Sequence, residues 1–219
     1  MRTRIKICGI TRTEDAAVAV AAGADAIGLI FFPGSRRAVD LAQAASVARE
    51  IPPLVDLVGV FVDPGEPDIA SVLDKVPLTA LQFHGSEPAA ECERYGLPYI
   101  KGIRMMDQVD PAQLPGKYPS AGAFLLDTYH ADTLGGTGVS FDWDRARIKL
   151  PVPVILAGGL NSGNVGEALG QSGAWAVDVS TGVEFGPGRK SPDKIRSFCQ
   201  AVAAWDLQAA RTTQGAQAK

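Results

Sequence analysis

The chain has 219 residues, of which 46% are hydrophobic and 21% charged, with a formal net charge of −3. This length and apolar share suffice for the core of one large α/β domain. The charge argues against nucleic-acid binding as the main task, because such surfaces need clustered Lys and Arg and no basic run of five or more occurs.

The sequence gives no sign of membrane insertion or export. No stretch approaches the ~20 consecutive apolar residues of a membrane helix. The N-terminus, MRTRIKICGI, lacks a long apolar segment followed by a small-residue cleavage site. The cysteines Cys8, Cys92 and Cys199 are odd in number and far apart, which suggests neither a disulfide framework nor a zinc site. We therefore expect a cytoplasmic protein with no nucleic-acid and no membrane partner.

Short apolar runs alternate along the chain with amphipathic stretches rich in Ala, Glu and Arg. Their spacing of roughly 20 to 30 residues is what a strand plus a returning helix requires. Continuous apolar character, rather than strict alternation, predicts strands buried on both faces, as in a parallel sheet. The eight predicted strands are 4–8, 26–31, 57–62, 80–83, 99–103, 123–127, 152–157 and 174–179.

Capping signals predict where several helices begin and end. Thr11 and Glu14 have the spacing of a capping box before the first helix, and Gly23 stands where a glycine C-cap would. Asp40 precedes the second amphipathic run, and Pro192 opens the last one.

Eight strand–helix units in residues 1–205 predict an α/β fold made of a single closed (β/α)8 TIM barrel. Residues 206–219 are polar, and we expect them to form a disordered tail. An open doubly wound sheet is the alternative, but no G-x-G-x-x-G follows the first strand. In a TIM barrel the active site lies at the carboxyl ends of the strands, so the residues at those ends are the functional candidates.

Two strand-end residues could transfer protons. Cys8 ends the first strand; it is either a buried structural cysteine or a general base, if its pKa falls from ~8.5 towards neutrality. Asp127 follows three apolar residues, and partial desolvation there favours a raised pKa and a protonated, donating carboxyl. The alternative for Asp127 is a turn residue that hydrogen-bonds its own loop through Thr128.

Glycine-rich loops follow the last two predicted strands. Gly158 and Gly159 follow the seventh, and Ser180, Thr181 and Gly182 follow the eighth. Phosphate sites in TIM barrels are commonly built from these two loops, where backbone N–H groups can approach the anion closely. The sequence therefore predicts a phosphate site, with two ordinary glycine turns as the alternative.

Other polar residues at strand ends are further candidates for the pocket. Arg37, in the loop after the second strand, could bind a carboxylate with two parallel hydrogen bonds, although a solvent-facing arginine fits the sequence equally well. Gln82, His84 and Asp178 also lie at strand ends. A lone histidine is more often structural than catalytic, so His84 carries no role from its type alone.

Several longer motifs occur together over nearly the whole chain apart from the tail. With these motifs the sequence resembles the phosphoribosylanthranilate isomerase family. The motifs are KICGIT at 6–11, GADAIGLIFFPGSRR at 23–37, LVGVFVD at 57–63, LQFHG at 81–85, LLDT at 125–128, GGTGVSFDW at 135–143, LAGGLN at 156–161, and VDVSTGVE with PGRK within 177–190.

The resemblance implies an enzyme of tryptophan biosynthesis. Its reaction would be the Amadori rearrangement of N-(5-phospho-D-ribosyl)anthranilate to 1-(2-carboxyphenylamino)-1-deoxy-D-ribulose 5-phosphate. By motif, Cys8 would be the general base, Asp127 the general acid and Arg37 the partner of the anthranilate carboxylate, with the phosphate on the two glycine loops. Because both steps are proton transfers, we expect no metal and no cofactor. The implied partner is a phosphorylated small molecule, bound by a monomer or a homodimer.

One departure and two alternatives accompany the resemblance. Ala38 follows Arg37 where many relatives carry an aromatic residue, which removes a packing contact over that loop. The related histidine-pathway aminoaldose isomerase would be expected to carry an Asp where this chain has Cys8, and to show a second phosphate site. A non-catalytic phosphate-binding barrel would not require Cys8 and Asp127 together.

Overall fold

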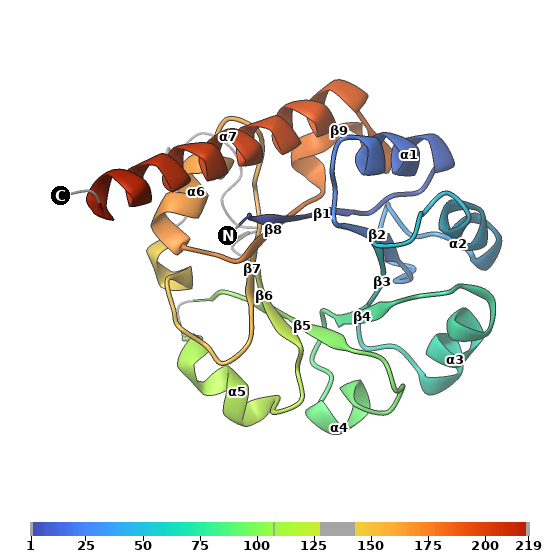
Figure 1. Ribbon diagram of the computed structural model, residues 1–219. Coiled ribbons are helices and arrows are strands. Elements are labelled where there is room, and N and C mark those ends of the chain that lie inside the picture. Colours follow the sequence, from blue (N-terminus) through green and yellow to red (C-terminus); the bar gives the residue numbers. More distant parts are fainter. Residues whose placement is uncertain (1, 107, 128–142, 218–219) are drawn as a thin grey trace.

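The computed structural model describes residues 2–106, 108–127 and 143–217. Eight parallel strands form a closed barrel in chain order, and β8 pairs with β1 to complete it (Figure 1). The strands are β1 (Arg4–Cys8), β2 (Ala26–Ile30), β3 (Asp56–Phe61), β4 (Ala80–Phe83), β5 (Tyr99–Arg104), β6 (Ala123–Asp127), β7 (Val154–Ala157) and β8 (Ala176–Val179). The predicted (β/α)8 barrel is confirmed, and the predicted strand bounds differ from these by at most two residues.

Helices surround the barrel on its outside (Figure 1). They are α1 (Thr13–Ala21), α2 (Leu41–Ala48), α3 (Glu66–Lys75), α4 (Ala89–Cys92), α5 (Leu114–Lys117), α6 (Val165–Ser172) and α7 (Pro192–Gln217). Shorter elements are the 3₁₀ turns η1 (Pro111–Gln113), η2 (Trp143–Ala146) and η3 (Thr181–Val183), and a two-stranded ribbon of β9 (Glu184–Gly186) and β10 (Arg189–Lys190). Within the described ranges, no helix combines the length and the apolar character needed to span a membrane.

Three of the four capping predictions are confirmed. Pro192 is the first residue of α7. Asp40 is the N-cap of α2 and forms a capping box with Gln43, and Gly23, with φ of 95°, follows the C-cap of α1. The capping box predicted at Thr11 is wrong, because α1 begins two residues later without a side-chain cap. The Thr11 hydroxyl instead donates a hydrogen bond to the carbonyl of Gly188 at 2.6 Å, so a contact distant in sequence takes the place of the local one.

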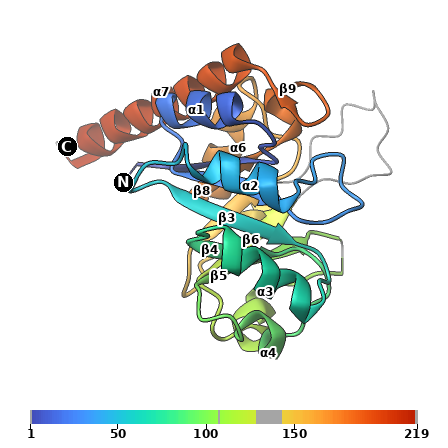
Figure 2. The same cartoon turned by 90° about the vertical axis from the view of Figure 1, so that its right-hand side faces the viewer.

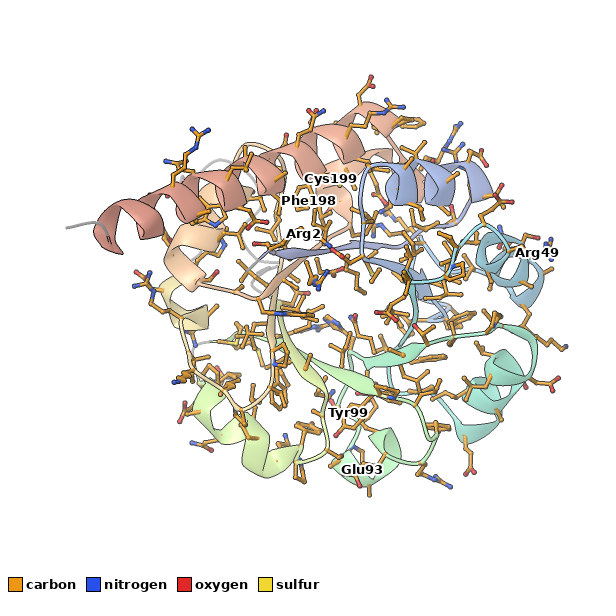
Figure 3. All side chains as sticks on the ribbon, in the orientation of Figure 1. Arg2, Arg49, Glu93, Tyr99, Phe198 and Cys199 are labelled. Atoms are coloured by element: carbon orange, nitrogen blue, oxygen red, sulfur yellow. The ribbon has the colours of Figure 1, made fainter. Side chains whose placement is uncertain are left out.

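Apolar side chains pack in two layers because successive residues of a strand point to opposite faces. The outer layer lies between the strands and the helices and includes Ile7, Phe83 and Phe124. Phe198 and Cys199 on the barrel-facing side of α7 belong to the same layer and are buried (Figure 3). The inner layer fills part of the barrel interior with small and branched residues: Ala123, Leu125, Ile155, Ala157 and Ala176.

The tail differs from the expectation of disorder after residue 205. Helix α7 continues to Gln217. The ring of Trp205 packs against Gly170 of α6, where an added Cβ would lie 2.9 Å from the ring. The Asp206 carboxylate accepts hydrogen bonds from the Thr3 amide at 2.9 Å and the Thr3 hydroxyl at 2.6 Å. Low hydrophobicity misled the prediction, since Ala, Leu, Gln and Arg are strong helix formers.

The barrel has two distinct ends, as the side view shows (Figure 2). Both chain termini lie at the end where the strands begin, on the left of that view. The loop between β2 and α2 and the β9 ribbon lie at the other end, where the strands finish. The predicted functional residues therefore gather at this second end.

Candidate active site

Cys8 lies at the carboxyl end of β1 with only 6% of its surface exposed. Its register partner on β2 is Gly28, where an added Cβ would lie 2.8 Å from the Cys8 sulfur. The glycine therefore makes room for the thiol. Burial raises the pKa of Cys8 above its ordinary value, although the nearby Lys6 ammonium opposes the shift. The condition for Cys8 to act as a general base, a pKa lowered towards neutrality, is therefore not met in the chain without substrate.

A buried ion pair lies beside Cys8. The ammonium of Lys6 on β1 is 2.8 Å from a carboxylate oxygen of Asp178 on β8, and both side chains are at least nine-tenths buried. The two residues are register partners across the closure of the barrel. Burial opposes the charge on Lys6, but Asp178 and Cys8 outweigh it, so the pKa of Lys6 is raised.

Asp127 ends β6, and its carboxylate faces His84. Asp127 Oδ2 lies 3.3 Å from His84 Nε2, and the other ring nitrogen, Nδ1, lies 3.0 Å from the amide nitrogen of Gln82. Gly102 leaves room for the imidazole, because an added Cβ would lie 2.4 Å from Nδ1. Gln82, His84 and Asp127 therefore form one continuous row. Thr128, the turn partner in the alternative interpretation of Asp127, lies outside the described residues.

Arg37 crosses the strand end next to Cys8. An added Cβ on Gly9, whose φ is 72°, would lie 2.5 Å from the Arg37 side chain. Two guanidinium nitrogens, Nε and Nη2, donate to the two oxygens of Glu184 at 2.7 and 2.8 Å. Lys190 donates to the same carboxylate at 2.9 Å. Burial opposes ionisation of Glu184, but the bonds from Arg37 and Lys190 outweigh it and lower the pKa of Glu184.

The glycine loops after β7 and β8 touch each other. Gly158 and Gly159 have φ of 94° and 65°, a left-handed backbone that favours glycine. Gly182 lies in η3, and an added Cβ there would fall 1.9 Å from the carbonyl oxygen of Leu160. The absence of a side chain at Gly182 is therefore what allows the two loops to pack together.

These groups surround a cavity of about 340 Å³ at the carboxyl end of the barrel. Its lining comprises Arg37, Asp127, Ala157, Gly158, Gly159, Leu160, Asp178, Val179, Ser180 and Thr181. A larger cavity of about 540 Å³ opens at the opposite end of the barrel, near Arg4 and Trp175. The smaller cavity is the functional candidate, because it joins a carboxyl group and a guanidinium to glycine-rich backbone suited to an anion.

The family profile of N-(5′-phosphoribosyl)anthranilate isomerase matches residues 5–201 of the chain. The chain belongs to the phosphoribosylanthranilate isomerase family. A member named N-(5′-phosphoribosyl)anthranilate isomerase from Pseudomonas fluorescens is 52% identical over 199 residues, which cover 91% of this chain and 95% of that one.

Solved structures of phosphoribosylanthranilate isomerases share the fold. Two are from Thermotoga maritima, with identities of 36% and 34% and TM-scores of 0.82 and 0.79; the second shows monomers of a dimeric enzyme. A third, at 36% identity and a TM-score of 0.78, holds reduced 1-(o-carboxyphenylamino)-1-deoxyribulose 5-phosphate. Each alignment covers 92% of this chain and 99% of the other.

The fold of this family member brings most of the site residues predicted from its sequence to one place. Arg37, Asp127, Asp178 and both glycine loops meet at the cavity. Cys8 is buried within electrostatic reach of Asp178, and Gln82 contacts the site through His84. The motif residues 135–142 lie outside the described residues.

Several buried charged residues of the site were not among the candidates that the search of strand ends produced. Lys6, Glu184 and Lys190 sit at the site, and a further pair, Lys101 and Glu87, fixes the loop that carries His84. The Lys101 ammonium and the Glu87 carboxylate are 2.8 Å apart, and each side chain is 1% exposed. The available signal for Lys6 was its spacing, since a residue two positions before Cys8 on a strand shares its face.

Proposed function

We propose that the chain converts N-(5-phospho-D-ribosyl)anthranilate to 1-(2-carboxyphenylamino)-1-deoxy-D-ribulose 5-phosphate. The observation that carries the proposal is the single cavity that joins Asp127, Arg37 and two glycine loops beside Cys8, in a member of this isomerase family. A cysteine at the end of β1 also favours this substrate over the histidine-pathway compound, for whose enzyme we expected an Asp there.

In the proposed reaction Asp127 donates a proton to the furanose ring oxygen as the bond from that oxygen to C1′ breaks. The anilino nitrogen supplies the electron pair, which gives a protonated Schiff base. The Cys8 thiolate then removes the C2′ proton, and its electron pair forms the C1′–C2′ double bond of an enolamine. Loss of the O2′ proton and protonation of C1′ give the aminoketone. A positioned acid or base contributes about 10²–10⁴-fold in rate.

The proposed binding contacts use groups that line the cavity. We assign the phosphate to backbone N–H groups of the loops at Gly158–Gly159 and Ser180–Gly182, whose glycines allow close approach. Glu184 already occupies Nε and Nη2 of Arg37. We therefore assign the anthranilate carboxylate to the remaining Arg37 nitrogen, Nη1, so that Glu184 orients the guanidinium.

The assay is the loss of anthranilate fluorescence when purified chain is mixed with substrate. We expect Cys8→Ser and Asp127→Asn each to lower kcat by at least about 10²-fold, because each removes one proton-transfer group. Circular dichroism checks that both variants stay folded. Cys199→Ser, at a buried cysteine on α7 away from the cavity, is the matched control and should keep wild-type kcat. If either site variant kept near wild-type kcat, its assigned role would be wrong.

We propose a cytoplasmic enzyme that works as a monomer or a homodimer. The three cysteines are buried free thiols, as is usual in a reducing compartment. The Thermotoga maritima relative that is described as dimeric supports testing for a homodimer. Light scattering coupled to gel filtration gives the mass that distinguishes the two states.

A further inference from the structure

Lys6 and Cys8 meet inside the barrel beside the same glycine. They lie two residues apart on β1 and are 4% and 6% exposed. A Cβ added to Gly28 would lie 2.8 Å from the Cys8 sulfur and 3.3 Å from the Lys6 ammonium. The ammonium and the sulfur are therefore close neighbours, and they interact electrostatically.

The second partner of Lys6 is Asp178, at 2.8 Å. Taking both charges out of water costs free energy that their attraction often only offsets, so stability alone is a weak reason for such a pair. The pair also lies next to the residue to which we assign the base. Its position points to a role in the chemistry of the sulfur.

Cys8 can act as a base only after it has lost its own proton, and burial opposes that loss. The charged groups that face Cys8 are Lys6 on the same strand, Asp178 on β8, Lys190 on β10 and Arg37 after β2. Lys190 and Arg37 are both hydrogen-bonded to Glu184. Lys6 is also paired, with Asp178, but of these cations it acts most strongly on the Cys8 sulfur and is hydrogen-bonded to it.

We propose that Lys6, held in place by Asp178, is the positioning residue that stabilises the thiolate of Cys8 once its proton has left. The proposal deepens the proposed function and rests on Cys8 being the base. The Cys8 proton leaves to solvent, and the Lys6 ammonium balances the resulting thiolate. The C2′ proton of the substrate then moves to the sulfur, while Lys6 keeps its own proton throughout.

Two variants break the same ion pair with opposite consequences for Cys8. Lys6→Met removes a cation and should move thiolate formation to higher pH, by about one pH unit or more. Asp178→Asn removes an anion and should move it to lower pH. The measurement is the pH dependence of iodoacetamide alkylation at Cys8 in the full-length chain, followed by peptide mass spectrometry. Burial raises the pKa of Cys92 and Cys199 to about 11, and the mapping separates their peptides from that of Cys8.

Activity gives the second readout. If thiolate formation in Lys6→Met moves up by about one pH unit, kcat near neutral pH should fall about 10-fold, with little change in KM. The lost rate should return as pH rises. Lys6→Arg keeps the cation and should restore part of the rate. A structural role alone would instead lower Tm in both ion-pair variants and leave the alkylation profile where it was.

The outcomes separate this proposal from the one that it rests on. Unchanged alkylation in Lys6→Met, or changes in the same direction for both variants, would overturn the role of Lys6. If Lys6→Met does not fold, Asp178→Asn decides alone, since an unchanged or higher alkylation pH there contradicts the proposal. Activity retained in Cys8→Ser would instead remove the base assignment, while the altered alkylation profiles would still show the Lys6–Cys8 interaction.

Discussion

The contacts of His84 favour one tautomer of its ring. With the Gln82 amide oriented so that its nitrogen lies 3.0 Å from Nδ1, that nitrogen donates and Nδ1 accepts. The proton of the neutral ring then lies on Nε2, which is 3.3 Å from the Asp127 carboxyl group. A donor at Oδ2 would hold the Asp127 carboxyl group in one orientation. We therefore expect His84 to orient Asp127, a role that its residue type alone did not predict.

Substitutions at His84 test that orienting role. His84→Gln can place an amide donor near the position of Nε2, whereas His84→Ala removes the donor. We expect His84→Ala to lose about 10-fold or more in kcat, the cost of roughly one hydrogen bond in the transition state, and His84→Gln to lose less. Steady-state kinetics with the fluorescence assay measure both. Equal losses in the two variants would show that the donor is not what matters.

Cys8 and Asp127 became candidates because the active site of a TIM barrel lies at the carboxyl ends of its strands, and the family motifs supplied their proposed roles. The sequence did not predict their electrostatic surroundings. Lys6 and Asp178 are 172 residues apart and Arg37 and Glu184 are 147 apart, so neither pair is visible without the fold. The direction of the Cys8 pKa could not be predicted for the same reason, since it depends on burial in the closed barrel and on Lys6 and Asp178.

At the scale of elements, local sequence patterns predicted the strands more accurately than they predicted the ends of helices and the contacts of loops. The eight strands follow from apolar runs that two-sided burial requires. The extension of α7 to Gln217 depends instead on helix propensity and on the bonds from Thr3 to Asp206, which cross 203 residues. The catalytic barrel that we propose as the single domain therefore includes at least the first turn beyond residue 205.

The packing of the two glycine loops gives a test at the same scale. Gly182→Ala would place a Cβ 1.9 Å from the Leu160 carbonyl oxygen, so the loop after β8 must move away from the loop after β7. If both loops hold the phosphate, KM should rise about 10-fold or more, equivalent to about 1.4 kcal/mol of lost binding. Gly186→Ala on β9 is the control, because an added Cβ there meets nothing within 4 Å. An unchanged KM in a folded Gly182→Ala chain would contradict the phosphate assignment.

At the scale of the whole molecule, the site lies where the barrel closes. Lys6 bonds to Asp178, Arg37 to Glu184, and the amide of Lys190 to the Asp15 carboxylate at 3.1 Å. Each contact joins the first two strand–helix units to the last one. The proposed base, the Arg37 contact and the phosphate loops are therefore assembled by the same long-range pairings that complete the fold.

Glu184, which bonds to Arg37 where the barrel closes, should make the stability of the fold depend on pH in the acid range. Its pKa in the folded chain is lowered, so its ionised form stabilises the fold above its ordinary pKa near 4.5, and that contribution disappears as pH falls through the lower folded value. Glu184→Gln should therefore lower the free energy of unfolding by about 1–3 kcal/mol at pH 7. The difference from wild type should shrink as pH falls below 4.5. Urea unfolding followed by tryptophan fluorescence measures both curves. Glu50→Gln, at an exposed residue, is the control and should match wild type at every pH. If the free energy of unfolding of Glu184→Gln were lower than that of wild type by the same amount at every pH, Glu184 would contribute packing rather than charge.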